Sequence, residues 1–118
     1  MKGDNRNVRP RGKFWLESED GRYLMGPRTL RLLRAIEATG NLKAAAREAG
    51  FSYRAAWARL REVEIALGFP LARSRSGGEG GGGTRLTEEG KNFLQRYQRF
   101  LEAAEEGLSR AFREAFGE

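Results

Sequence analysis

The sequence predicts a mainly helical protein with small β elements, an α+β fold class, on three observations. Apolar residues recur at steps of three and four through residues 27–67, which is the spacing of helices that bury one face. The segments 13–25 and 69–86 combine short alternating runs with glycine-containing turns, a pattern typical of β-hairpins. A long apolar stripe through residues 87–115 predicts a long C-terminal helix.

The composition favours a binding protein over a catalyst. The 118 residues carry a formal net charge of +6 and include neither cysteine nor histidine, which excludes disulfides, Cys/His zinc sites and the commonest general base. The 16 acidic residues form no recognisable catalytic pattern, so we expect no enzyme activity, cofactor or metal. Residues 1–86 hold the basic excess, the electrostatic footprint of nucleic-acid binding. Without a membrane-length apolar run or secretory signal, a cytoplasmic, nucleoid-associated protein is expected.

Two short helices joined by a tight turn are predicted within residues 41–67, after a helix over 27–39. We expect Asn41 to cap the first of the pair, Gly50 to end it and Ser52 to cap the second. The apolar side of the second helix consists of Ala56, Leu60, Val63 and Leu67. Its opposite side carries Arg54, Ala58 and Arg61. This is a helix-turn-helix pattern, in which the second helix enters the DNA major groove.

A hairpin and a wing are predicted on either side of these helices. Residues 13–25 form the hairpin, with an Asp-Gly turn. Strands over 69–75 and 84–86, joined by the glycine run Gly77–Gly83, form the wing 69–86. Glycine at the wing tip lets the backbone approach a phosphate, and Arg73, Arg75 and Arg85 supply charge. The polar residues 1–11 predict a flexible basic tail, either an arm that touches DNA or a solvated terminus.

The long helix 87–115 is predicted to join two copies of the chain. Thr87 caps it, and at 1.5 Å per residue it is about 40 Å long, more than one small domain needs to cover itself. Its apolar stripe predicts a dimerisation surface of Leu94, Tyr97, Leu101, Ala104, Leu108 and Phe112. The alternative is that the helix folds back over its own domain. Residues 12–118 are expected to form a single domain.

Several motifs together resemble a known family. The segment Ala45-Ala46-Arg47-Glu48-Ala49-Gly50-Phe51-Ser52, followed by Gly68-Phe69-Pro70-Leu71, resembles the LysR-type winged helix-turn-helix. The SY-x-x-AW segment at 52–57, the glycine run and Leu86-Thr87 then resemble the DNA-binding domain of the molybdate-dependent, ModE-type regulators. The resemblance covers about Gly12 to Leu108 and implies double-stranded DNA as a partner. Regulators of this type bind molybdate in further β-barrel domains, so molybdate binding is not expected from this chain.

The predicted DNA-contacting set lies on the second helix of the pair and on the wing. It comprises Ser52, Tyr53, Arg54, Trp57, Ala58, Arg61, Arg73, Arg75, Gly81, Gly82, Thr84 and Arg85. Arginine can bond bidentately to guanine. Periodicity alone places Tyr53 in the core and Trp57 at its edge, whereas the resemblance implies a position at or near the DNA surface. For Tyr53 both interpretations stay open.

These observations predict a sequence-specific DNA-binding transcriptional regulator, a homodimer that reads a two-fold-related operator through residues 52–67 and the glycine-rich wing. Two alternatives remain open at this point. One is a chromosome-binding protein with little preference between sequences, and the other is a winged-helix module that docks an acidic protein partner.

Overall fold

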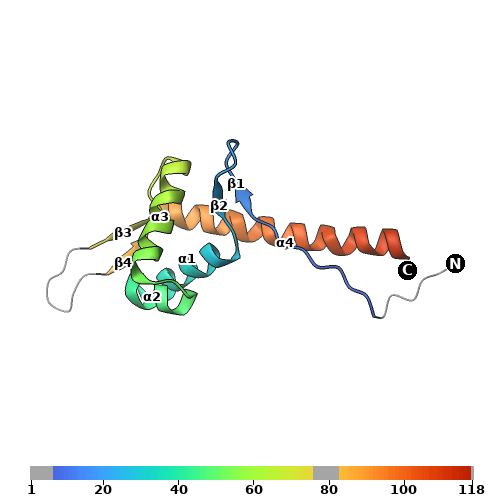
Figure 1. Ribbon diagram of the computed structural model, residues 1–118, viewed down its shortest axis with the longest axis horizontal. Helices are drawn as coiled ribbons and strands as arrows, with labels where there is room; N and C mark the ends of the chain where they lie inside the picture. The colour runs from blue at the N-terminus through green and yellow to red at the C-terminus, as the bar shows by residue number, and fades with distance from the viewer. Residues whose placement is uncertain (1–6, 76–82, 118) are drawn as a thin grey trace. The chain divides into compact units, whose positions relative to one another are not determined.

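The computed structural model describes residues 7–75 and 83–117 and confirms the mainly helical α+β class (Figure 1). Its elements follow in the order β1 (Leu16–Glu17), β2 (Tyr23–Met25), α1 (Pro27–Thr39), α2 (Leu42–Ala49), α3 (Tyr53–Leu67), β3 (Ala72–Ser74), β4 (Thr84–Leu86) and α4 (Glu88–Phe116). The chain divides into two units, one of residues 15–95 and one that combines residues 1–14 with 96–118. The single domain expected over 12–118 stays a prediction.

Local signals set the ends of the helices. Pro27 occupies the first turn of α1, which ends at Gly40 with φ of +67°. The Asn41 side chain accepts a hydrogen bond of 2.9 Å from the Ala44 amide at the start of α2, and the Ser52 hydroxyl accepts one of 3.0 Å from the Ala55 amide at the start of α3. These caps satisfy amides that have no partner inside the helix. The predicted helix-turn-helix boundaries are confirmed.

The three short helices enclose the core of the 15–95 unit. Side chains at helical spacing are almost fully buried, namely Leu32, Leu33 and Ile36 of α1, Ala45 and Ala46 of α2, and Ala56, Leu60 and Val63 of α3. The predicted stripe of α3 is therefore confirmed at its first three positions. Leu67, the fourth, is only half-buried because it is the last residue of the helix.

The two hairpins are antiparallel and shorter than the sequence predicted. In the first, β1 has only two residues and its register with β2 shifts between Leu16 and Glu17. In the second, the strand expected over 69–75 covers only Ala72–Ser74. The strand starts late because the Leu71 amide donates to the Glu64 carboxylate of α3 (2.7 Å) and is not free to pair with a strand. The amide of Ala72, the first residue of β3, also donates to this carboxylate (3.3 Å).

Thr87 and Gly90 fasten the start of α4 to the segment before β3. The Thr87 amide donates to the Leu71 carbonyl (2.9 Å), and its hydroxyl donates to the Pro70 carbonyl (2.6 Å). The same hydroxyl accepts from the Gly90 amide (2.8 Å) and so caps α4, as predicted. A Cβ at Gly90 would overlap the Leu71 carbonyl oxygen. Thr87 and Gly90, the threonine and glycine of the segment LTEEG at residues 86–90 (an LT-x-x-G motif), therefore hold the start of α4 in place.

In the second unit, α4 continues without a break through Gly107 to Phe116. The Tyr97 hydroxyl donates to the Phe14 carbonyl (2.9 Å), and Gly12 lies near Leu108. Tyr97 is 1% exposed and Leu94, in the other unit, 2% exposed. Both were predicted to contact a second copy, and the structure corrects this because their side chains are already buried within the chain. Leu101, Ala104, Leu108 and Phe112 are half-buried.

Candidate nucleic-acid interface

One face of α3 is exposed along its whole length. Arg54, Ala58, Arg61 and Ile65 follow one another at steps of four, three and four, and all are exposed. At 3.6 residues per turn these steps keep the side chains on one side of the helix, opposite the buried stripe. Among the described residues no ion pair engages Arg54 or Arg61. Both guanidinium groups are therefore available to an anion or to a base edge.

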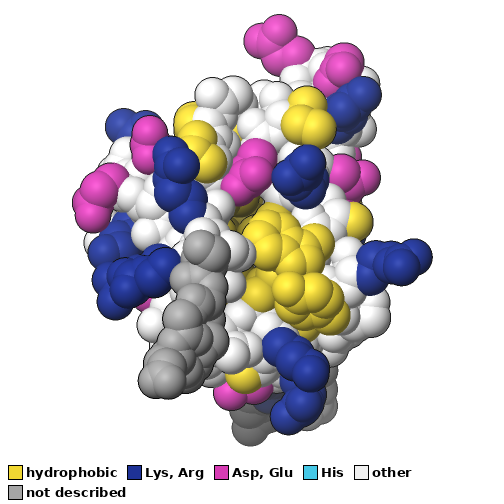
Figure 2. Space-filling model, turned by 90° about the vertical axis from the view of Figure 1, so that its left-hand side faces the viewer, with side chains coloured by type: hydrophobic (Ala, Val, Ile, Leu, Met, Phe, Trp, Pro, Cys, Tyr) yellow, Lys and Arg dark blue, Asp and Glu magenta, His cyan; other side chains and the backbone are white. Residues whose placement is uncertain are grey.

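Two aromatic residues stand beside this face at the N-terminal end of α3. Tyr53 is 52% exposed, and Trp57 is half-buried with its ring edge-on to Tyr53 at 6.5 Å between centroids. The structure corrects the interpretation of Tyr53 as a core residue, because the buried stripe of α3 begins only at Ala56. Its DNA contact remains a prediction. On the side of the molecule that carries the wing, hydrophobic side chains gather with Lys and Arg side chains around them (Figure 2).

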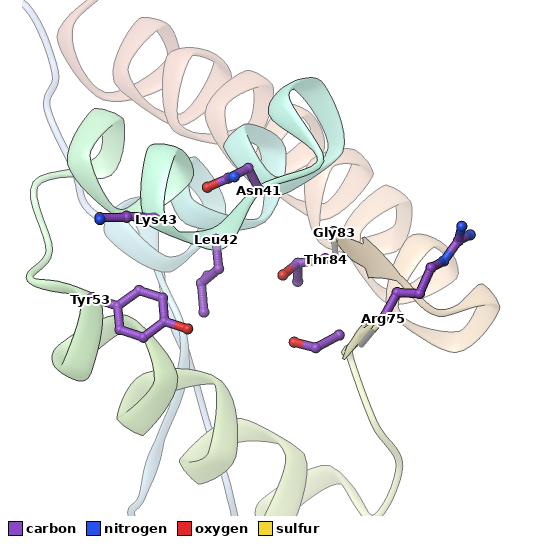
Figure 3. A pocket seen from close by; sticks show the side chains of 8 residues that line it. Asn41, Leu42, Lys43, Tyr53, Arg75, Gly83 and Thr84 are labelled. Carbon is purple, nitrogen blue, oxygen red and sulfur yellow. The ribbon is translucent and has the colours of Figure 1, made fainter. Parts of the chain in front are cut away.

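A groove of about 530 Å³ separates the start of α3 from the wing (Figure 3). Tyr53 and Leu42 lie on one side of it and Thr84 on the other, while the Arg75 side chain extends away. Its lining comes from the ends of four elements, with Asn41, Leu42, Lys43, Tyr53, Ser74, Arg75, Gly83 and Thr84. Tyr53, Arg75 and Thr84 were predicted from the sequence as DNA contacts, whereas Asn41, Lys43 and Ser74 were not, because they come together with them only through the tertiary fold.

The wing is attached to the helix-turn-helix by a backbone hydrogen bond. The Thr84 amide donates to the Gly40 carbonyl at 2.9 Å, and the Arg75 amide donates to the Gly83 carbonyl at 2.7 Å. Thr84 itself is 5% exposed, so only a small part of its side chain could reach a ligand. Gly81 and Gly82 lie outside the described residues, and their predicted contacts stay predictions.

Arg73 and Arg85 lie directly opposite each other in the β3–β4 ladder, and both are exposed. Their neighbours in the register, Ala72 and Leu86, are buried, so the two arginines project from the outer face of the hairpin. Like charges in opposed positions repel each other. A phosphate between them would relieve that repulsion. Arg73, Arg75 and Arg85 also line a second groove of about 420 Å³, together with Glu88 and Glu89.

Two other arginines make contacts within the protein. Arg28 donates to the Gly50 carbonyl and stacks over Phe51, 4.2 Å from its centroid, so it braces the turn between α2 and α3. Arg59 donates to the Thr29 hydroxyl at 2.9 Å and stacks over Tyr23 at 4.7 Å. Arg59 was not predicted from the sequence, where its only signal is a position at the edge of the buried stripe of α3. Among the described residues, Asp20 in the β1–β2 turn has a carboxyl group whose pKa is lowered, chiefly by a hydrogen bond from Ser18. Asp20 is not part of the α3 face or of the wing.

A helix-turn-helix with an exposed basic second helix and an attached wing defines a winged helix-turn-helix domain. The family model described as "Bacterial regulatory helix-turn-helix protein, lysR family" matches residues 27–91. The chain belongs to this LysR family of bacterial regulatory helix-turn-helix proteins.

Comparison with individual proteins confirms the resemblance to ModE-type regulators. The chain is 41% identical over 73 residues to the molybdenum-pterin-binding protein MopB of Rhodobacter capsulatus. This match covers 62% of this chain and 27% of that protein. It is 37% identical over 71 residues to the DNA-binding transcriptional dual regulator ModE of Escherichia coli K12, and this match covers 60% of this chain and 27% of that protein. The chain thus spans little more than a quarter of these relatives.

A solved structure with a similar fold carries the description "CbnR_DBD-DNA complex". Its TM-score is 0.58 at 31% identity, and the match covers 75% of this chain and 95% of that one. In the described part of this chain no helix is long and apolar enough to cross a membrane.

Proposed function

We propose that this protein is a sequence-specific double-stranded DNA-binding regulator of transcription, which acts as a homodimer on a two-fold-related operator. The observation that carries the proposal is the exposed face of α3, where Arg54 and Arg61 flank Ala58. Arginine reads guanine bidentately, and a small apolar side chain contacts the thymine methyl group. The relatives whose names denote transcriptional regulators, and the similar fold described as a DNA complex, support the same assignment.

The wing supplies the sequence-independent part of the proposed affinity. Arg73, Arg75 and Arg85 are exposed around its base, where they can contact phosphates and release counterions. Tyr53 lines the groove between the wing and α3, and Trp57 lies edge-on to Tyr53. Both would pack against the sugar-phosphate backbone or a base edge. These contacts orient the protein, whereas α3 reads the sequence.

Dimerisation, location and the absence of catalysis complete the proposal. The half-buried residues Leu101, Ala104, Leu108 and Phe112 of α4 would pair with those of a second copy. We assign the protein a binding role and no enzyme activity, and we place it in the cytoplasm on the nucleoid. Because the similarity to ModE-type relatives lies in their DNA-binding portion, we expect molybdate to leave the affinity of this chain for DNA unchanged.

The test is to select a duplex from a random-sequence pool with the full chain and to measure its affinity by fluorescence anisotropy at several salt concentrations. A scrambled duplex of the same composition serves as the reference. Arg54→Ala and Arg61→Ala are compared with Arg22→Ala, which removes the same charge from the exposed β1–β2 turn. One arm adds molybdate.

The proposal expects strong preference for the selected duplex, lost in Arg54→Ala and Arg61→Ala and kept in Arg22→Ala. Equal affinity for both duplexes would instead indicate a general chromosome-binding protein. No binding at low salt would leave the protein-interaction module as the remaining assignment.

A further inference from the structure

We propose that Arg59 is a positioning residue that fixes the rotation of α3, and through it the sequence selectivity of the protein. The inference rests on the proposed DNA-binding function and adds a residue that does not itself touch DNA. Arg59 belongs to α3, yet its side chain reaches α1 and β2, so it links the base-reading helix to two other elements.

Four contacts hold the Arg59 guanidinium, one of them with the Phe51 ring, whose centroid lies 5.8 Å from its central carbon. Its Nη1 donates to the Thr29 hydroxyl at 2.9 Å, and its plane lies over the Tyr23 ring, 4.7 Å from the centroid. Its Nε lies 3.7 Å from a carboxylate oxygen of Glu62 on the next turn of α3. The side chain is 26% exposed, far less than the 70% of Glu62. A planar guanidinium held on a hydroxyl and a ring has a defined direction.

Thr29 and Tyr23, which contact Arg59, are themselves tightly packed. Thr29 is fully buried, and its hydroxyl lies 3.4 Å from that of Tyr23. The Tyr23 hydroxyl in turn occupies the space that a Cβ at Gly26 would need. On the other side, Arg28 bonds the Gly50 carbonyl and stacks over Phe51. The turn before α3 and the middle of α3 are therefore both anchored to the start of α1.

The inner face of α3 needs such an anchor. Apolar burial is non-directional, and near Arg54 the buried face has only the single methyl group of Ala56, because the larger Leu60 and Val63 lie further along α3. At 3.6 residues per turn, Arg59 lies about 140° around the helix from Arg54, away from the exposed face. Rotation of α3 that broke the Arg59–Thr29 bond would turn Arg54 and Arg61 relative to the groove they read. Arg59 therefore controls base contacts without making one.

The test uses the full chain with the selected and scrambled duplexes defined above. Arg59→Met keeps an unbranched apolar side chain and removes the guanidinium, whereas Arg59→Lys keeps the charge and removes the planar fork. Thr29→Val removes the acceptor, and the double variant with Arg59→Met tests whether the two act together. The measurements are the affinity ratio between the duplexes, the salt dependence of binding, and the melting temperature.

We expect Arg59→Met and Arg59→Lys each to lower the affinity ratio on the order of fivefold or more, as one mismatched base pair does. Affinity for the scrambled duplex and the salt slope stay at the wild-type values, and the double variant loses no more selectivity than Arg59→Met alone. If the slope of log affinity against log salt concentration fell by about one in Arg59→Met, Arg59 would be a phosphate contact and the inference would be overturned. An unchanged ratio would also overturn it, whatever the melting temperature. A wild-type chain without selectivity would refute the proposed function and this inference together.

Discussion

The backbone amide of Thr84 donates a hydrogen bond of 2.9 Å to the carbonyl oxygen of Gly40. This bond joins the first residue of β4 to the residue that ends α1, where φ of +67° suits glycine. Gly83 also lies close to Gly40, because a Cβ at Gly83 would lie 3.0 Å from the Gly40 carbonyl oxygen. The wing base and the residue between α1 and α2 are thus joined through backbone atoms.

The glycine of the LT-x-x-G motif is predicted to be structural. Gly90→Ala would push a methyl group into the Leu71 carbonyl, and we expect a loss of about 1–3 kcal/mol in unfolding free energy. Gly107→Ala is the matched control on the same helix, where a Cβ meets nothing within 4 Å. There we expect a gain of up to about 1 kcal/mol from helix propensity. Urea denaturation measures both, and a Gly90→Ala chain as stable as the wild type would contradict the packing described here.

Glu64 is predicted to stabilise the turn between α3 and β3. Glu64→Ala leaves the Leu71 and Ala72 amides without their acceptor, and we expect a loss of about 1–3 kcal/mol. Glu64→Gln keeps one carbonyl oxygen and should lose less. The control is Glu48→Ala, at an exposed position of α2, for which thermal and urea unfolding should change little. Equal losses at Glu64 and Glu48 would remove this role from Glu64.

The opposed arginines of the wing give a prediction in which stability and affinity move in opposite directions. Arg73→Glu places opposite charges in the Arg73–Arg85 ladder position, so we expect a higher melting temperature. Affinity for DNA should fall at the same time, equally for selected and scrambled duplexes, because phosphate contacts carry no sequence information. Arg22→Glu, with the same change in net charge, is the control for DNA binding. Unchanged affinity in Arg73→Glu would remove this face of the wing from the interface.

Self-association through α4 is predicted to depend on its half-buried apolar residues. A charge at Leu101 or Phe112 would be buried in the paired helices, so Leu101→Glu and Phe112→Glu should shift the protein toward monomer in sedimentation equilibrium. Ser109→Glu, at an exposed position of the same helix, should leave the association unchanged. Variants that associate as the wild type does would place the dimer contact elsewhere.

The sequence predicted the elements whose causes are local. Asn41, Ser52 and Thr87 are helix caps in the structure because a cap needs only its own side chain and an amide two or three residues on. The length of β3 could not be predicted in this way. It depends on Glu64, seven residues earlier, which takes the Leu71 amide.

The candidate site was predictable where helical periodicity decides exposure, as for Arg54, Ala58 and Arg61. Periodicity failed at Tyr53, since the first residue of α3 precedes the part of the helix that its neighbours cover. It did not single out Arg59, whose partners Thr29 and Tyr23 lie 30 and 36 residues earlier in the chain. Contacts between distant residues decide such roles, and only the tertiary fold brings them together.

The most direct test of the central claim is a base-by-base binding profile of the wild type and Arg54→Ala. Every base pair of the selected duplex is replaced in turn, and the affinity of both proteins is measured for each replacement. If α3 reads the major groove, Arg54→Ala loses discrimination of about 1–3 kcal/mol at one base pair of each half-site and keeps the rest of the profile. A profile weakened evenly at all positions would mean that Arg54 contacts only phosphates, and would contradict sequence reading by this face of α3.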